Sequence, residues 1–139
     1  ADHRHLHSFP TRRSSDLARH RTLRVAALAM GLAEKAVSLF YELKLHDRIS
    51  EAWAGRCRSQ IAGVLAALER ERAERIGDWW FDDRIGHADI ALACALRFAG
   101  EAHPDLVALG DYPALEAHSA RCEALDVFKT ISQPFIPPA

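Results

Sequence analysis

The feature that most constrains the fold is the segment ADIALACALRFA, residues 88–99, which is apolar on almost every side of a helix. After Asp89 its only charge is Arg97. A helix without a polar face belongs in the middle of a bundle, packed on several sides. We therefore expect this segment to be the central core helix of a domain whose other helices cover it.

Two long amphipathic stretches precede that segment. In residues 21–45 the apolar residues recur at spacings of three and four, which places on one helix face Val25, Leu28, Leu32, Ala36, Leu39 and Leu43. After a break with Ser50 as a candidate N-cap, the next stretch places on one face Trp53, Cys57, Ile61, Val64, Leu65 and Leu68. The residues expected to face solvent on its other side are Glu51, Arg56, Arg58, Glu69, Arg70 and Arg72. The pattern predicts two long antiparallel helices.

The rest of the chain predicts shorter helices. Residues 76–87 break the periodicity and form the main irregular connection. A helix is expected from near Asp111, with Pro113 in its first turn, and it carries Leu115, His118, Ser119, Cys122 and Leu125. A last short helix spans residues 127–132, before prolines end regular structure. No strand pattern occurs, so the sequence predicts an all-α bundle of about five helices.

Gly86 and Asp89 predict a structural N-capping box at the start of the central helix. Asp89 stands three residues after Gly86, where its carboxylate can reach back to the free backbone N–H groups of the first turn. Glycine has no side-chain oxygen, so only the half of the box made by Asp89 is available. We interpret Asp89 as a cap and not as a catalytic residue.

Composition restricts the partners and the compartment. The chain has 139 residues, is 49% hydrophobic, and carries a net charge of −1, which fits one globular domain and favours neither nucleic acid nor membrane as a partner. Three widely spaced cysteines, Cys57, Cys94 and Cys122, lie in apolar helical patterns and indicate reduced thiols in a cytoplasm. His118 and Cys122 lie one turn apart, but two ligands make no closed metal site, so no metal is expected.

The first 17 residues differ in character from the rest. Residues 7–17, HSFPTRRSSDL, resemble one reading frame of a common sequencing adapter. We interpret residues 1–17 as an artefactual, unstructured segment and residues 18–139 as the domain. A metal-binding reading of His3, His5 and His7, or a basic-arm reading of Arg12 and Arg13, then loses its support.

The order of a long helix pair, WWFDDRIGHADIALACALRF at residues 79–98, and YPALEAHSARCEALDVF at residues 112–128 resembles the C-terminal domain of bacterial glutathione S-transferases. The resemblance covers about residues 19–138, and its most specific part is GHADIALA at residues 86–93. The family usually has Ser or Thr where this chain has Gly86. The resemblance implies a preceding thioredoxin-like domain, which holds the glutathione-binding and thiol-activating residues and is missing here.

The resemblance further implies the activity of the intact protein. It would be a cytoplasmic homodimer that conjugates glutathione, its co-substrate, to small hydrophobic electrophiles or uses glutathione to reduce them. For this chain alone it implies no catalytic residue, no bound cofactor and no activity. The alternative is a non-catalytic protein-interaction module of the same fold, attached to other proteins as a docking unit.

In that family the helical domain supplies the wall of the electrophile pocket. By helical spacing, Met30, Glu34, Val37 and Tyr41 share one side of the first long helix, and they are the candidates for this wall. The other interpretation is that they pack against a missing neighbour or face solvent. Relatives often carry an acidic residue, which helps to hold the glutathione amine, where this chain has Met30. The resemblance therefore does not imply a contact with glutathione from this domain.

Overall fold

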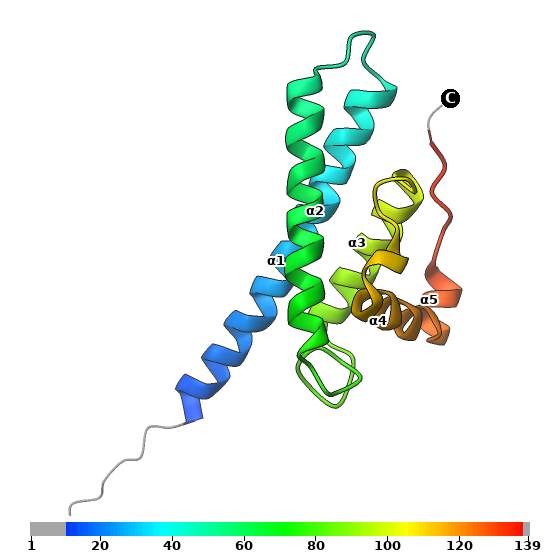
Figure 1. Cartoon of the computed structure of the whole chain (residues 1–139). Helices are drawn as coiled ribbons and strands as arrows, with labels where there is room; N and C mark the ends of the chain where they lie inside the picture. The colour runs from blue at the N-terminus through cyan, green and yellow to red at the C-terminus, as the bar shows by residue number, and fades with distance from the viewer. Residues whose placement is uncertain (1–10, 138–139) are drawn as a thin grey trace, which may run out of the picture.

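The computed structural model describes residues 11–137, and within them it contains helices and no strand. The elements in chain order are α1 (Thr11–Lys44), α2 (Glu51–Ala73), α3 (His87–Ala102), the 3-10 turn η1 (Leu109–Asp111), α4 (Pro113–Glu123) and α5 (Asp126–Ile131). Figure 1 shows α1 and α2 as a long antiparallel pair with the shorter helices on one side. The predicted all-α bundle of five helices is confirmed.

The predicted inner faces of the two long helices form most of the core. On α1, Val25, Leu32, Ala36 and Leu39 have no exposed surface, and Leu28 and Leu43 pack beside them. On α2 the fully buried residues include Cys57, Ile61, Leu65 and Leu68, whereas Trp53, predicted on the same face, is 39% exposed in the first turn. The Ser50 hydroxyl accepts a hydrogen bond from the Trp53 N–H at 3.4 Å, so Ser50 is the N-cap of α2 as expected.

The start of α1 differs from the sequence-based expectation. Residues 1–17 were expected to lack structure, yet α1 begins at Thr11, so residues 11–17 are helical. Extension of an existing helix adds one hydrogen bond for each residue fixed and avoids the cost of nucleation, and residues 11–17 contain no proline or glycine to stop it. The interpretation of this segment as an artefact stays a prediction, and His3, His5 and His7 lie outside the described residues.

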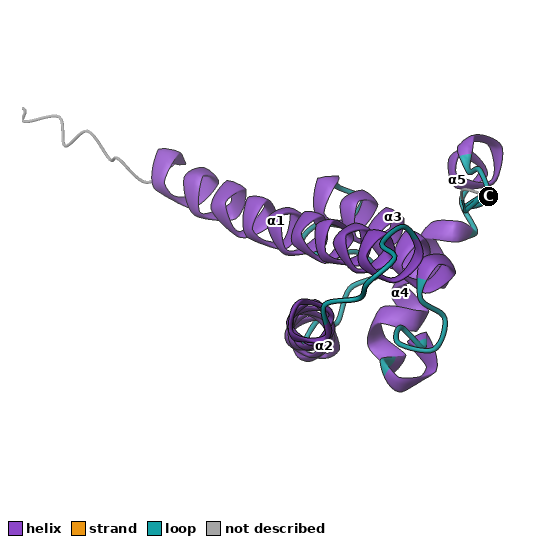
Figure 2. Cartoon of the chain, turned by 90° about the horizontal axis from the view of Figure 1, so that it is seen from above, coloured by secondary structure: helices purple, strands orange, loops and turns teal. Residues whose placement is uncertain are grey.

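The segment expected to be the central helix is α3, and it is covered on only part of its surface. It packs along α1 on one side and against α4 on another, burying Ala88, Leu92, Ala93, Ala95, Leu96 and Ala99. Viewed from above, α3 lies beside α1 while α2 stands apart from it (Figure 2). The prediction of packing on several sides therefore fails on one face, because Ile90 is 44% exposed and Cys94 is exposed.

Two α2 residues that were expected to face water are tied into the fold instead. Both carboxylate oxygens of Glu69 accept backbone N–H groups at the start of α4, from Ala114 and Leu115, each at 2.9 Å. The Arg72 side chain is buried and donates to the carbonyl oxygens of Gly77 at 2.7 Å and Asp78 at 3.0 Å. The prediction was wrong because the loop after α2 and the start of α4 fold back over the last turns of α2.

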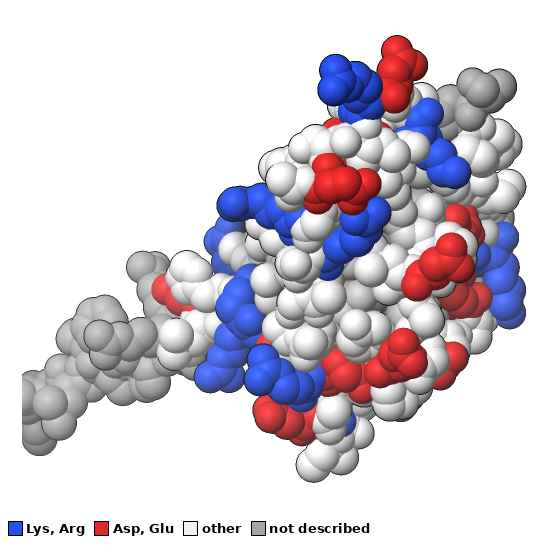
Figure 3. All heavy atoms as spheres, turned by 45° about the horizontal axis from the view of Figure 1, so that its top comes forward, with Lys and Arg blue, Asp and Glu red and all other residues white. Residues whose placement is uncertain are grey.

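The outer surface carries both signs of charge. On the face shown in Figure 3, basic and acidic side chains are interspersed, and neither sign covers the face continuously. None of the helices in residues 11–137 is long and apolar enough to cross a membrane.

Candidate functional site

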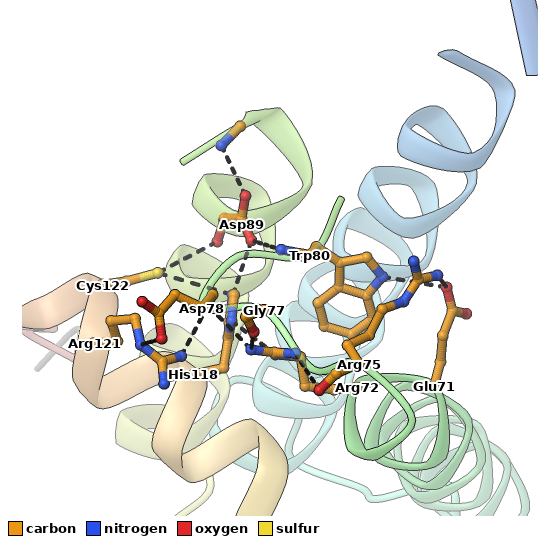
Figure 4. Close-up of polar contacts among 11 residues, drawn as sticks. Glu71, Arg72, Arg75, Gly77, Asp78, Trp80, Asp89, His118, Arg121 and Cys122 are labelled. Carbon is orange, nitrogen blue, oxygen red and sulfur yellow. Dashed lines mark hydrogen bonds and ion pairs between the residues drawn. The ribbon is translucent and has the colours of Figure 1, made fainter. Parts of the chain in front are cut away.

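Asp89 lies at the centre of a buried polar cluster at the start of α3 (Figure 4). Its Oδ2 atom accepts a hydrogen bond from the Gly86 N–H at 2.7 Å, the contact that an N-capping aspartate makes at this position. Its Oδ1 atom accepts a hydrogen bond from the Trp80 N–H, also at 2.7 Å. One carboxylate therefore fixes both the first turn of α3 and the loop that leads into it.

Replacing Gly86 with serine is expected to raise the free energy of unfolding by about 0.5 to 1 kcal/mol. The backbone at Gly86 is extended, with φ −125°, and an added Cβ would lie 3.5 Å from Asp89 Oδ2, an ordinary contact. The serine hydroxyl could then accept the Asp89 N–H and complete the box. Urea unfolding followed by circular dichroism measures the change. The Gly86→Ala variant adds Cβ without the hydroxyl, and equal stability of the two variants would contradict the prediction.

His118 on α4 is fully buried beside Asp89. Its Nδ1 atom accepts a hydrogen bond from Arg72 Nε at 3.2 Å. Because arginine has no acceptor, the neutral ring must carry its proton on Nε2, which lies 3.4 Å from Asp89 Oδ1. Burial lowers the pKa of His118 to about 4, and Arg72 adds to this shift while Asp89 opposes it. The imidazole is therefore neutral at neutral pH.

Cys122 completes a cysteine, histidine and aspartate group that resembles a nucleophilic site in composition only. Its Sγ atom lies 3.9 Å from His118 Nε2, but neither side chain has exposed surface. Burial raises the pKa of the Cys122 thiol to about 12, so the reactive thiolate is absent at neutral pH. The cluster is structural, and the interpretation of His118 and Cys122 as a buried helix face is confirmed. Within residues 11–137, no group of three or more metal-ligating side chains is placed to hold an ion.

The tryptophans of the connecting loop close the base of the bundle. Trp80 is 1% exposed, and its indole Nε1 donates a hydrogen bond to Glu71 at 3.2 Å. Its ring stands edge to face with His118, with the ring centres 5.6 Å apart. Trp79 is half-buried and lies against the same imidazole. These contacts confirm the sequence-based view of the pair as a plug.

The four candidate pocket-wall residues lie on the uncovered side of α1. Met30 is 64% exposed, Tyr41 52% and Val37 36%, and Glu34 is also exposed. None of them lines the two cavities next to α3. An exposed row of large apolar side chains fits either interpretation, a pocket wall or a surface that awaits a neighbour. Their role stays a prediction.

The exposed face of α3 borders an apolar cavity of about 440 Å³, here called the α3–α5 pocket. Its apolar walls are formed by Ile90, Cys94 and Phe98 of α3 and by Val127, Phe128 and Ile131 of α5. Ser132, Gln133 and Phe135 of the C-terminal tail form a further side. The sequence did not predict this pocket, because the apolar helix was expected to lie at the centre of the bundle, packed on several sides.

The sequence did not reveal the roles of Arg72 in the buried cluster or of Glu69 beside it. Each meets partners more than 40 positions away in the chain, at His118 for Arg72 and at Ala114 and Leu115 for Glu69. One signal was available, since Pro113 at the first position of α4 leaves the next N–H groups in need of an acceptor. The sequence did not say which side chain supplies it.

The fold and this site define a helical bundle in which an aspartate caps the core helix. Residues 51–121, just over half of the chain, match the family model described as glutathione S-transferase, C-terminal domain. The chain therefore belongs to the glutathione S-transferase family, through that domain. No protein of curated function matches it.

Solved structures of bacterial glutathione transferases share the fold. A glutathione S-transferase from Methylobacillus flagellatus with glutathione bound is similar with a TM-score of 0.77 at 23% identity over 96% of this chain, which shows the fold. One from Methylobacterium radiotolerans, in complex with glutathione sulfonate, has a TM-score of 0.74 at 27% identity over 94% of this chain. A family member from Pseudomonas fluorescens with bound glutathione has a TM-score of 0.73 at 32% identity over 85%. The chain spans 64%, 61% and 56% of these proteins, respectively.

Proposed function

We propose that this chain is the helical half of a glutathione transferase. Joined to a thioredoxin-like domain that binds glutathione, it would help to conjugate glutathione to small hydrophobic electrophiles or to reduce them. The observation that carries the proposal is the likeness, at 32% identity over 85% of this chain, to a transferase family member with bound glutathione. The additional length of that protein leaves room for such a domain.

In this proposal the exposed side of α1 forms the wall of the electrophile pocket. Met30, Val37 and Tyr41 present apolar surface that a small hydrophobic molecule can cover, and Glu34 is the polar group among them. The chain alone would be inactive. A transferase must hold a thiolate by hydrogen bonds, whereas the buried His118 and Cys122 are inaccessible to any substrate.

We further propose that the intact enzyme is a homodimer in the cytoplasm. The cysteines Cys57 and Cys122 are buried as free thiols, and Cys94 is exposed and also unpaired. Unpaired cysteines suit a reducing compartment. The exposed apolar row on α1 suits a protein that is covered by further protein surface.

The test is to fuse residues 18–139 to the glutathione-binding segment of the Pseudomonas fluorescens relative and to assay conjugation of 1-chloro-2,4-dinitrobenzene. We expect no catalysed rate from the chain alone and a catalysed rate from the fusion. In the fusion, Tyr41→Ala should raise KM for the electrophile roughly tenfold, the equivalent of one lost apolar contact, and leave KM for glutathione unchanged.

The control is Ile76→Ala, since Ile76 is a fully exposed apolar residue that lies in the loop after α2 and not on α1. It should leave both KM values unchanged. A folded fusion that binds glutathione but does not catalyse conjugation would contradict the enzyme proposal and favour the interaction module. Equal effects of the two substitutions would remove Tyr41 from the pocket wall.

A further inference from the structure

Two cavities meet at a group of charged side chains beside α3. One is the apolar α3–α5 pocket of about 440 Å³. The other, here called the polar cavity, holds about 560 Å³ and has Ser119 and Lys129 among its lining residues. The two form one continuous hollow with an apolar and a polar part, because both are lined by Arg97, Glu101, Glu123 and Ser132.

Ser119 on α4 is a buried polar residue of the polar cavity. It is only 7% exposed, and in the part of the chain that the structure describes its hydroxyl forms no hydrogen bond. Other helical hydroxyls of the domain, at Thr22, Ser38 and Thr130, each donate to the carbonyl oxygen four residues earlier. Buried hydroxyls normally have a partner. The Ser119 hydroxyl is therefore available to a molecule that enters the cavity.

The charged residues of the polar cavity comprise two of each sign, Arg97 and Lys129 against Glu101 and Glu123. Arg97 Nη2 lies 2.9 Å from Glu123 Oε2, and Arg97 Nε lies 3.8 Å from Glu101 Oε1. Among residues 11–137, Arg97 Nη1 and Glu123 Oε1 have no hydrogen-bond or ion-pair partner. A donor that can bind a carboxylate and an acceptor that can bind an ammonium group therefore lie next to each other.

We propose that this hollow binds an α-amino acid with a large apolar side chain. Arg97 and Ser119 donate to its carboxylate, and Glu123 accepts from its ammonium group. The side chain lies in the α3–α5 pocket, where Phe98 and Phe128 are among the apolar walls. An anion alone would meet two carboxylates, and a cation alone would meet two cationic side chains, whereas a zwitterion matches both signs.

This site is separate from the proposed electrophile pocket. None of the candidate wall residues on α1 lines either cavity. The proposal therefore goes beyond the transferase activity and does not depend on it.

The experiment is an NMR titration of the isotope-labelled full chain with L-phenylalanine at neutral pH. Two analogues keep the ring but lack one charge: hydrocinnamate lacks the ammonium group, and phenethylamine lacks the carboxylate. We expect L-phenylalanine to shift the signals of residues that line both cavities. It should bind at least about tenfold more tightly than either analogue, because each analogue loses a charge-assisted hydrogen bond.

Two variants assign the contacts. Glu123→Gln removes the charge that holds the ammonium group, so affinity for L-phenylalanine should fall about tenfold while hydrocinnamate binds no more weakly. Ser119→Ala removes a donor to the carboxylate, so both of these ligands should bind about tenfold more weakly. The control Ser59→Ala, at an exposed serine of α2 that lines neither cavity, should change affinity by less than about twofold. The urea midpoint of each variant shows whether it is folded.

Three results would overturn the site. In the first, neither L-phenylalanine nor L-leucine shifts the signals of the cavity residues up to its solubility. In the second, hydrocinnamate or phenethylamine binds as tightly as L-phenylalanine, so that the two charges are not read together. In the third, Ser119→Ala and Glu123→Gln bind L-phenylalanine as well as Ser59→Ala does. The titration contains neither glutathione nor an electrophile, so its outcome is independent of the transferase test.

Discussion

Replacing Asp89 with alanine is expected to lower the free energy of unfolding of the domain by about 4 kcal/mol. The carboxylate is 2% exposed and accepts two backbone N–H groups at 2.7 Å, one from Gly86 and one from Trp80. Its loss leaves the buried Trp80 N–H and the partly buried Gly86 N–H without an acceptor, and each such donor costs roughly 1 to 3 kcal/mol. Urea unfolding followed by circular dichroism at neutral pH measures the effect.

Two further variants separate the hydrogen bonds from the general effect of removing a charge near a helix start. Asp89→Asn keeps the shape and one acceptor oxygen, so about half of the loss is expected. Asp126→Ala removes a fully exposed carboxylate from the first turn of α5 and should change stability by less than about 0.5 kcal/mol. If Asp89→Ala lost no more than Asp126→Ala, Asp89 would not be the residue that holds the loop to α3.

The features that the sequence predicted well are those set by neighbours along the chain. Helical spacing alone identified the buried faces of α1 and α2, because a residue such as Leu32 must follow the rotation of its own helix. The cap at Asp89 needs only four consecutive residues. Such local patterns do not depend on which other segment of the chain packs against the helix.

Features that depend on folding back of distant segments were not predictable in the same way. Arg72 follows Leu68 by four residues and so continues the buried face of α2, but its charge led to a prediction of solvent exposure. Its polar partners, at Gly77 in the loop and at His118 of α4, could not be identified from the sequence. Similarly, the composition of α3 requires cover for its surface but does not say where the cover comes from. Ile90 and Cys94 are exposed because none of the other described helices packs over their side of α3, which the sequence pattern could not show.

The candidate pocket wall shows where sequence spacing reaches its limit. Spacing correctly placed Met30, Val37 and Tyr41 together on one side of α1, and they are exposed there. Spacing does not say which molecule covers an exposed apolar row, because an electrophile, a second domain and a second copy all bury the same surface. The KM test on the fusion protein distinguishes the electrophile from protein partners.

The second large effect concerns pH. His118 is fully buried and meets charged or titratable groups from three helices: Arg72 of α2, Asp89 of α3, and Arg121 and Cys122 of α4. Burial lowers its pKa from 6.5 to about 4, so the folded protein binds a proton there less readily than the unfolded chain does. Stability from the neutral ring is therefore complete above pH 6.5 and is lost as the pH falls towards 4.

Wild-type protein is expected to lose about 2 kcal/mol of unfolding free energy through His118 between pH 7 and pH 5, and about 3 kcal/mol in all by pH 4. The variant His118→Asn should not show this loss, because its amide oxygen can still accept from Arg72 but takes up no proton in that range. Urea unfolding at pH 7, 6 and 5 measures the difference in slope between the two proteins.

Above pH 5 the effect of His118 is separated from the effects of two carboxylates with lowered pKa values, the buried Glu42 and the half-buried Glu71. The Ser50 N–H hydrogen bond lowers the pKa of Glu42; for Glu71, burial opposes but hydrogen bonds from Arg24, Trp80 and Arg75 lower it overall. Stability from these two groups is present above pH 4.5 and is lost only below it. The matched control is His87→Asn, since His87 is exposed at the start of α3 and should keep the wild-type slope. If His118→Asn kept that slope too, another group would have to account for the sensitivity to acid.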